Sequence, residues 1–147
     1  LRLIQEFKRF DRYDQESTLI MMDIDHFKKV NDKYGHTVGD DVIRQVSRAM
    51  KEQVRDLDIA GRYGGEEFGV ILTGTDAQGA AVFAERLRTT VEKMVVISEG
   101  QQVRFTISMG ISQLSDKIVD HRAWIEKADA ALYQSKEGGR NRFTIAS

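Results

Sequence analysis

The stretch IAGRYGGEEFGVIL, residues 59–72, predicts a β-hairpin and with it the centre of the fold. Apolar residues occur in both arms, and the pair Gly64-Gly65 separates them. A Gly-Gly pair is a recognised two-residue hairpin turn, because both central positions can require positive φ. Two carboxylates, Glu66 and Glu67, follow the glycines directly. Since adjacent acids repel and add nothing to a strand, this segment is either an ordinary exposed turn or a site that holds a cation.

The segments on either side of the hairpin complete an alternating order of strands and helices. Residues 18–23 (TLIMMD) are an apolar run that ends in an acid, which is typical of a strand buried on both faces. Clean alternation predicts another strand over 104–112. Helical spacing predicts the two connecting helices, at 40–55 and along an apolar face that runs over 80–94. The order β-α-β-β-α-β predicts an α+β fold with a ferredoxin-like antiparallel sheet, helices on one face and additional helices around this core.

Further elements are expected outside this core. They are helices at 1–15 and 123–136, a short helical turn at 26–35 and a final strand at 142–145. Residues 75–78 (TDAQ) have capping-box spacing ahead of the second core helix. Because no repeat or linker divides the chain, residues 1–147 are interpreted as a single domain.

Composition and charge limit the chemistry that is available. The chain has no cysteine and a net charge of −1. The lack of cysteine excludes disulfides, zinc–thiolate sites and thiol chemistry, and the balanced charge argues against binding of a nucleic-acid polymer. No apolar run reaches the length of a membrane span and no signal peptide is visible. We therefore expect a cytoplasmic domain without membrane contact, in a parent protein that is either free or membrane-anchored.

The predicted topology brings carboxylates from two strands together. The first strand of a β-α-β-β-α-β sheet lies beside the central hairpin, so Asp23 faces the turn that carries Glu66 and Glu67. Like charges raise one another's pKa, and a cluster of hard oxygen ligands suits Mg²⁺ or Mn²⁺. In the alternative interpretation, Asp23 and Asp25 cap a turn and the glutamates are solvated. We choose Asp23 as the ligand and expect Asp25 to cap the following turn.

Three motifs together resemble the signature of GGDEF-domain diguanylate cyclases. They are RYGGEEF at 62–68, DIDHFKKVND at 23–32 followed by YGH and GD, and ADAALY at 128–133 ending in KEGGRN at 136–141. The resemblance covers nearly the whole chain, in order and at the family's spacing. It implies a core similar to the palm of polymerases and to nucleotide cyclases. It also implies condensation of two GTP into cyclic di-GMP with release of two pyrophosphates, across a face-to-face homodimer in which each 3′-hydroxyl attacks the other α-phosphate.

The resemblance also implies roles for the acidic residues. The implied metal ligands are Asp23, the backbone carbonyl of Ile24, Glu66 and Glu67. They would hold two Mg²⁺ or Mn²⁺ ions per active site, and the three carboxylates are the implied catalytic residues. Glu66 is in addition the implied base for the 3′-hydroxyl, although that proton can also leave without a protein base.

The implied substrate contacts come from four segments of the chain. They are Asn31, Asp40, Phe27, Lys28, Gly64, Gly65, Lys136 and Arg140. Asn31 and Asp40 match the guanine-reading pair, since a carboxylate can accept bonds from both N1–H and the 2-amino group of guanine. In the structural alternative, Asn31 is a turn residue and Asp40 is a helix cap. The two residues taken alone favour this alternative.

The remaining substrate contacts concern phosphate. Lys136 and Arg140 match the family's triphosphate contacts, and the Gly138-Gly139 break would let Arg140 curl back beside Lys136. The alternative for Lys136 is a lysine that complements the dipole at a helix C-terminus. Lys28 is a weaker candidate for the same role. Gly64 and Gly65 would let the nucleotide lie against the hairpin backbone.

A candidate regulatory site precedes the hairpin. Arg55 and Asp58 form the R-x-x-D pattern that matches the family's inhibitory site for cyclic di-GMP, and Arg86 matches a further arginine used there. A guanidinium suits both phosphate oxygens and the Hoogsteen edge of guanine. The alternative is an exposed ion pair at a helix end.

Three functional hypotheses follow. The first is a product-inhibited diguanylate cyclase, and the second is a non-catalytic receptor for cyclic di-GMP. The third is a ferredoxin-like interaction domain without either activity. Retention of Asp23, Glu66 and Glu67 argues against a pure receptor, which has no need of them. The family segment D-x-L-T-G-L-x-N-R is absent from the start, so we expect a domain excised from a longer protein.

Overall fold

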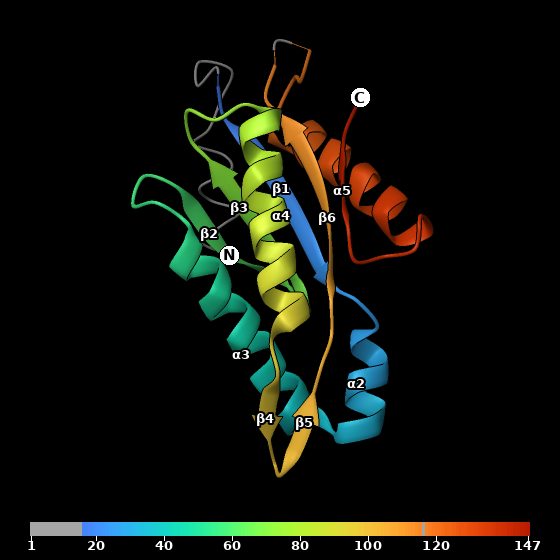
Figure 1. The fold of residues 1–147 in the computed structure, drawn as a ribbon. Coiled ribbons are helices and arrows are strands. Elements are labelled where there is room, and N and C mark those ends of the chain that lie inside the picture. The colour runs from blue at the N-terminus through green and yellow to red at the C-terminus, as the bar shows by residue number, and fades with distance from the viewer. Residues whose placement is uncertain (1–15, 116) are drawn as a thin grey trace.

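A computed structural model describes residues 16–115 and 117–147 of the chain. The helix expected at 1–15 lies outside the described residues. A five-stranded sheet in the order β2-β3-β1-β6-β7 forms the centre of the molecule (Figure 1). Its strands are β1 (Thr18–Ile24), β2 (Ile59–Gly64), β3 (Glu67–Leu72), β6 (Ile107–Gln113) and β7 (Phe143–Ile145).

The strand pairing confirms the predicted α+β ferredoxin-like core. β1 pairs with β3 on one side and with β6 on the other, and β2 pairs with β3, all antiparallel. β7 adds a parallel strand beside β6. The first strand of the core therefore lies beside the hairpin, as the sequence predicts.

Helices cover both faces of this sheet. The core helices α3 (His36–Gln53) and α4 (Ala77–Lys93) pack on one face, as expected, and α5 (His121–Glu137) packs on the opposite face (Figure 1). The short helix α2 (Phe27–Tyr34) follows β1 and contacts α3.

The two faces explain the continuous apolar run of β1. Ile20 and Met22 join the core cluster under α3 and α4, whereas Leu19 and Met21 pack against α5 and its fully buried Trp124. A strand with a hydrophobic core on both sides has no polar face, because successive side chains point to opposite faces. Each fully buried aliphatic side chain contributes about 1.5–3 kcal/mol, so β1 is a main source of stability.

The helix starts differ from the prediction, and the last helix, α5, begins at His121 rather than at residue 123. α3 begins at His36 rather than at residue 40, because Gly35 with φ of 94° separates it from α2. Asp40 therefore lies inside the helix and is not its cap. α4 is capped by Asp76, which accepts from the N–H of Gly79 at 2.9 Å, so the predicted capping box at 75–78 is wrong by one residue.

A small second hairpin, formed by β4 (Val96–Ser98) and β5 (Gln101–Val103), was not predicted from the sequence. Its turn residues Glu99 and Gly100 have φ of 50° and 73°, the positive values that a two-residue hairpin turn of the type I′ class requires. Because this hairpin occupies 96–103, the strand predicted from residue 104 begins at Ile107 instead.

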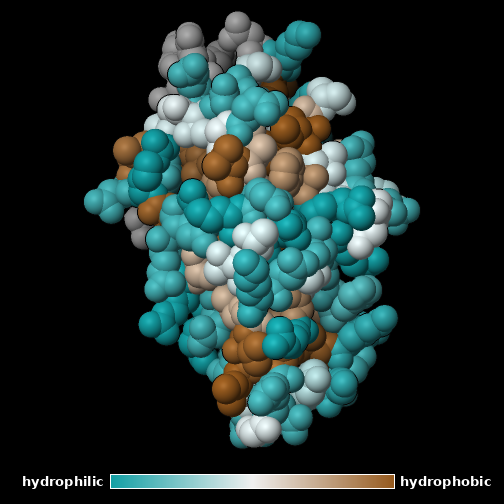
Figure 2. Space-filling view, viewed as in Figure 1, coloured by the Kyte–Doolittle hydropathy of each residue, from teal (hydrophilic) through white to brown (hydrophobic). Residues whose placement is uncertain are grey.

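The surface is mainly polar. In Figure 2, hydrophilic residues cover most of the visible face, and apolar residues lie in separate patches near its upper and lower ends. Among the residues that the structure describes, the exposed large apolar side chains are Leu57, Val82, Ile97, Val119 and Tyr133. Within the described residues, the structure has no helix with the length and apolar character needed to cross a membrane.

Candidate active site

The glycine turn of the hairpin differs in detail from the prediction. Gly64 pairs with Glu67 as the last residue of β2, so the turn residues are Gly65, with φ of 52°, and Glu66. The pairing of β2 with β3 shifts between Arg62 and Gly64, as in a β-bulge. A Cβ placed on Gly64 or Gly65 would meet no atom within 4 Å. The turn therefore leaves open space for a molecule to approach its backbone.

Asp23 lies directly beside this turn. In the antiparallel register it is opposite Glu67, and the N–H of the next residue, Ile24, donates to the carbonyl oxygen of Glu66 at 3.4 Å. The ammonium of Lys136 on α5 forms an ion pair with Asp23 Oδ2. Asp23 is only 7% exposed, and its other oxygen, Oδ1, is buried without a hydrogen-bond partner among the described residues. A buried carboxylate oxygen without a donor calls for a partner such as a water molecule or a cation.

Burial raises the pKa of Asp23 and of Glu67. Burial is the main cause for Asp23, opposed by Lys136, and the charges of Glu66 and Asp25 add to the rise. The pKa of Glu67 is raised by burial and by the charges of Asp129 and Asp23. Asp23 and Glu67 are therefore close enough to interact, and each of these two is less acidic than it would be in water.

Asp129 is a member of this site for which the sequence patterns predicted no role. Burial raises the pKa of its carboxyl, and its Oδ1 is buried without a hydrogen-bond partner among the described residues. Its charge raises the pKa of Glu67 and of Tyr63. The signal was available in the sequence, because Asp129 and Lys136 are seven residues apart and so share one face of α5.

The arrangement fits a divalent ion that binds together with a nucleotide. Within residues 16–115 and 117–147, no group of three or more Asp, Glu, His or Cys side chains is arranged to hold a metal ion. Mg²⁺ is commonly held by one or two carboxylates, several waters and substrate phosphate oxygens. Asp23, with its unpartnered oxygen, and Glu67 on the adjacent strand supply two such carboxylates.

The prediction that Asp25 caps the next helix is wrong. The N-cap of α2 is His26, and no side chain caps it. Asp25 is 5% exposed and accepts from the hydroxyls of Thr106 and Ser108, each at 2.6 Å, and from the N–H of Asn141 at 3.0 Å. Its role is to join the end of β1 to β6 and to the loop after α5.

α2 and α3 pack closely at Gly39, the residue before Asp40. A Cβ on Gly39 would lie 1.9 Å from Asn31 Oδ1 and 3.3 Å from Phe27 Cζ. The side chains of Asn31 and Phe27 therefore contact the residue that precedes Asp40, which is exposed on α3. Lys28 is exposed in the first turn of α2.

A pocket of about 750 Å³ lies between α3 and the hairpin. Its lining includes Asp40 and Arg44 from α3, Arg62 from β2 and Phe68 from β3. The volume is in the range of sites for small molecules, about 300–1,000 Å³. Arg62 also donates from Nε to the carbonyl oxygen of Gly65 at 2.7 Å and so fixes the glycine turn, a role that its place in the motif did not indicate.

The chain turns back after α5, as predicted. Gly138 caps the helix, Gly139 has φ of 120°, and the N–H of Arg140 donates to the carbonyl oxygen of Ser135 at 2.9 Å. Lys136, at the end of α5, forms an ion pair with Asp23 near the end of β1. It therefore does more than complement the helix dipole.

Arg55 and Asp58 form an ion pair of 2.9 Å in the structure, and the side chain of Asp58 is only 1% exposed. Arg55 also donates to the carbonyl oxygen of Thr73 at 2.6 Å, and Asp58 accepts from the N–H of Thr73 at 3.1 Å. Arg86 on α4 donates to Gln53 at 3.2 Å, two residues before Arg55. The three predicted residues thus lie where the end of α3 meets α4 and the end of the hairpin.

The family profile described as "Diguanylate cyclase, GGDEF domain" matches residues 1–142. The chain belongs to this family. The GGDEF domain of DgcB from Caulobacter crescentus, solved in complex with c-di-GMP, superposes with a TM-score of 0.91 at 34% identity, over 97% of this chain and 87% of that one. The GGEEF domain from Vibrio cholerae, described as the active domain of a diguanylate cyclase, has a TM-score of 0.88 at 31% identity, over 99% of this chain and 95% of that one. The predicted family and fold are confirmed.

Curated relatives extend well beyond this GGDEF chain. Diguanylate cyclase A of Treponema denticola is 43% identical over 129 residues, which are 88% of this chain and 35% of that protein. A probable diguanylate cyclase of Escherichia coli, DgcC, is 38% identical over 99% of this chain and 39% of that protein. The chain thus spans little more than a third of the length of these relatives.

Proposed function

We propose that this chain is the catalytic domain of a diguanylate cyclase, which condenses two GTP into cyclic di-GMP and releases two pyrophosphates. The observation that carries the proposal is the pairing of Asp23 with Glu67 at the open glycine turn, with one carboxylate oxygen of Asp23 buried and unpartnered. The GGEEF sequence of residues 64–68 supports it, because the similar Vibrio cholerae domain is described as active and carries the same five letters in its description.

The proposed metal ligands are the carboxylates of Asp23, Glu66 and Glu67 and the carbonyl of Ile24, the last residue of β1. Bound Mg²⁺ or Mn²⁺ ions, two per site in this proposal, would offset the charge that develops on the phosphate oxygens. Lys136 contributes a fixed cation beside Asp23. Glu66, in the turn itself, is the proposed base for the 3′-hydroxyl.

The nucleotide is proposed to lie against the turn with its base toward α2 and α3. Asn31 and Asp40 are the proposed guanine-reading residues, and Asn31 lies against Gly39, the residue before Asp40. Phe27 packs beside them. The phosphates lie against Lys136, Arg140 and Lys28, and the open backbone at Gly64 and Gly65 admits them closely.

One domain binds one GTP, so the proposed reaction needs two copies of the chain. Each 3′-hydroxyl attacks the α-phosphate of the nucleotide held by the other copy, forming two P–O bonds and breaking two bonds to pyrophosphate. A homodimer that forms face to face across the glycine turns meets this requirement.

Incubation of the chain with GTP and Mg²⁺ should give cyclic di-GMP on chromatography, at a rate that depends on the square of enzyme concentration when the dimer is weak. No product at any chain concentration, with GTP bound, would overturn the catalytic proposal.

The second candidate function is a binding site for the product, cyclic di-GMP, at Arg55, Asp58 and Arg86. It is favoured by the position of the three residues at one junction of α3, α4 and the hairpin. Alone it would make the chain a receptor; together with turnover it gives product inhibition. Binding of cyclic di-GMP without turnover would support the receptor.

Arg86→Ala is expected to weaken product inhibition, raising the inhibition constant for cyclic di-GMP at least about tenfold, since loss of a charge-assisted hydrogen bond costs about 1.5–3 kcal/mol. Arg86 is the better test than Arg55, because Arg55 also holds Asp58 and Thr73 in place. The measurement is the ratio of rates with and without added cyclic di-GMP. The matched control is Lys93→Met on the same helix. An unchanged inhibition constant in Arg86→Ala counts against this site.

Gly39→Ala is expected to raise the KM for GTP about tenfold while the fold is kept, because the new methyl group would lie 1.9 Å from Asn31 Oδ1 and must displace that side chain. Alanine is otherwise favoured over glycine in a helix by about 0.5–1 kcal/mol. Gly79→Ala adds the same methyl to the first turn of α4, where it meets the Thr75 side chain at 2.8 Å instead of Asn31, and serves as control. A KM within twofold of the unsubstituted chain would show that Asn31 does not contact the nucleotide.

A further inference from the structure

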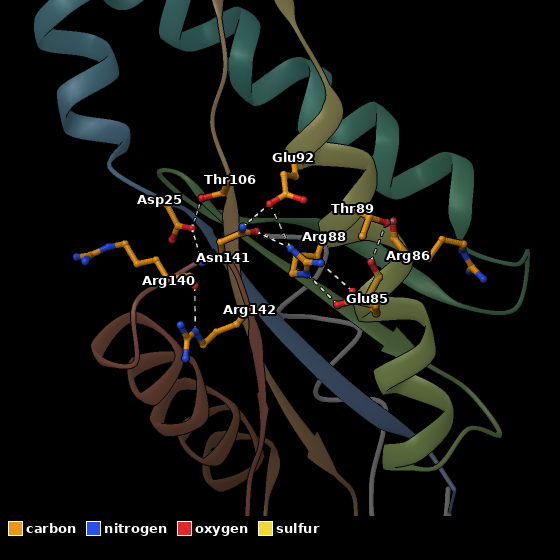
Figure 3. A network of polar contacts seen from close by, with 10 residues as sticks. All are labelled: Asp25, Glu85, Arg86, Arg88, Thr89, Glu92, Thr106, Arg140, Asn141 and Arg142. Atoms are coloured by element: carbon orange, nitrogen blue, oxygen red, sulfur yellow. Dashed lines mark hydrogen bonds and ion pairs between the residues drawn. The ribbon is translucent and has the colours of Figure 1, made fainter.

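Asn141, the residue after Arg140, is held from three directions. Its Oδ1 accepts from Arg88 Nη1 at 3.0 Å, and its Nδ2 donates to Glu92 Oε2 at 2.6 Å. Its backbone N–H donates to Asp25 Oδ2 at 3.0 Å. Figure 3 shows Asn141 between α4 on one side and Asp25 on the other, with the side chain of Arg140 pointing away from this network. We call the contacts of Asn141 with Arg88, Glu92 and Asp25 the Asn141 clamp.

The α4 side of the clamp is itself fixed. Arg88 donates to both carboxylate oxygens of Glu85, at 2.8 and 2.7 Å, and its side chain is only 17% exposed. A guanidinium held by a bidentate carboxylate has little freedom to rotate, so its third nitrogen is directed at Asn141. The opposite side is equally fixed, because Asp25 is buried and bonded to two hydroxyls of the β6 region.

The clamp holds a backbone that would not keep its shape alone. Arg140 and Asn141 have φ of 66° and 50°, in the left-handed region that L-residues other than glycine rarely adopt. Two consecutive residues in this region are unusual, although asparagine tolerates it better than arginine, and such a conformation persists where surrounding contacts over-determine it. The contacts that hold this backbone come from α4 and from Asp25, the residue directly after Asp23 and Ile24.

We infer that Arg88 and Asn141 are positioning residues that fix Arg140 relative to the Asp23–Ile24 segment, so that the guanidinium of Arg140 meets the β- and γ-phosphates of the nucleotide. The inference rests on the proposed function for the role of Arg140. According to this inference, the role of Arg140 depends on α4, which lies on the opposite face of the sheet from α5. Arg88 touches neither phosphate nor metal and acts through Asn141.

The test compares the chain with Arg88→Met, which removes the bond to Asn141, and with the control Lys93→Met, which removes one charge from the same helix. The first readout needs no nucleotide. The rate of hydrogen exchange at the backbone N–H of Asn141 is expected to rise at least about tenfold in Arg88→Met. In Lys93→Met it is expected to stay within twofold of the rate in the unsubstituted chain. An amide that exchanges at the same rate in all three proteins overturns the clamp, whatever the chain's function is.

The second readout is the affinity for 3′-deoxy-GTP and 3′-deoxy-GMP with Mg²⁺, two ligands that differ only in the β- and γ-phosphates and cannot condense. Arg88→Met should bind the triphosphate about fivefold to tenfold more weakly and the monophosphate unchanged. The double variant Arg88→Met/Arg140→Ala should bind the triphosphate no more weakly than Arg140→Ala alone. Arg88→Lys should bind the triphosphate more tightly than Arg88→Met. If Arg88→Met lowers the affinity for both ligands equally, or if the double variant binds the triphosphate more weakly than Arg140→Ala, Arg88 has a general structural role. Either result would overturn the positioning role and leave the proposed function standing. An unsubstituted chain that binds neither ligand overturns the proposed function and this inference together.

Discussion

Asp23→Asn is expected to lower the turnover of GTP at least about 1000-fold, which is about 4 kcal/mol of transition-state stabilisation at about 1.4 kcal/mol per tenfold. Asparagine keeps the shape of aspartate and lacks the charge that a divalent ion requires. Asp23 lies opposite Glu67 and has a buried oxygen without a hydrogen-bond partner among the described residues, so the substitution removes a charge from the centre of the proposed metal site. The measurement is initial rate of cyclic di-GMP formation at saturating GTP and Mg²⁺.

The same variant separates loss of chemistry from loss of fold. Burial raises the pKa of Asp23 in the folded chain without metal. The stability that this group contributes is therefore present at pH below its unfolded pKa and is lost as the pH rises through the folded value. An asparagine side chain at this position does not titrate, so at pH 7 and without metal the variant should melt at least as high as the unsubstituted chain.

Ligand binding gives the complementary readout. Mg²⁺ with 3′-deoxy-GTP should raise the melting temperature of the unsubstituted chain and raise that of Asp23→Asn far less, because only a state that binds ligand is stabilised by it. Asp32→Asn makes the same change at an exposed position of α2 and should behave like the unsubstituted chain. Turnover of Asp23→Asn within tenfold of the unsubstituted chain would remove Asp23 from the metal site.

Gly110→Ala is expected to destabilise the fold by about 3 kcal/mol or more, at the upper end of what overpacking a core costs. A Cβ at Gly110 in β6 would lie 2.1 Å from the carbonyl oxygen of Ala128 and 2.3 Å from the backbone nitrogen of Leu132. Both atoms belong to the backbone of α5 and cannot rotate away. The helix that carries Trp124, Asp129 and Lys136 must therefore shift as a whole.

Denaturant unfolding measures this effect as a lower midpoint at unchanged slope. Gly64→Ala is the matched control, since Gly64 also lies in a strand and a Cβ there would meet nothing within 4 Å. Its midpoint should correspond to a change of less than about 1 kcal/mol. If Gly110→Ala unfolds at the same midpoint as Gly64→Ala, α5 packs less closely against β6 than the contacts of Gly110 require.

The order of elements was readable because each one carries a strong local pattern. The apolar run of β1, the alternation around Ile107 and Met109 and the helical stripe of α4 each predicted the correct element. Boundaries were less predictable, since Gly35 ends one helix and starts another, and Asp76 competes with Thr75 as a cap. The β4–β5 hairpin was missed because three-residue strands have too little alternation to be recognised.

The site was predictable where it follows from strand order. The pairing of Asp23 with the turn follows from a ferredoxin-like order alone, and so does the common face of α3 and α4. The role of Asp25 was not predictable, because its partners Thr106, Ser108 and Asn141 are more than 80 residues away. The same holds for Gly39, whose need for a hydrogen in place of a side chain comes from Asn31 on another helix.

By itself, the sequence determined the elements of the core and their order, because each of these elements follows from a pattern among neighbours in the chain. Only the tertiary structure decided that Lys136 pairs with Asp23, that Asp129 joins the acids at the turn, and that α4 holds the loop of Arg140 through Asn141. Those contacts join residues that are distant in the chain. Their geometry is set by how α4 and α5 pack on opposite faces of the sheet, which no local pattern records.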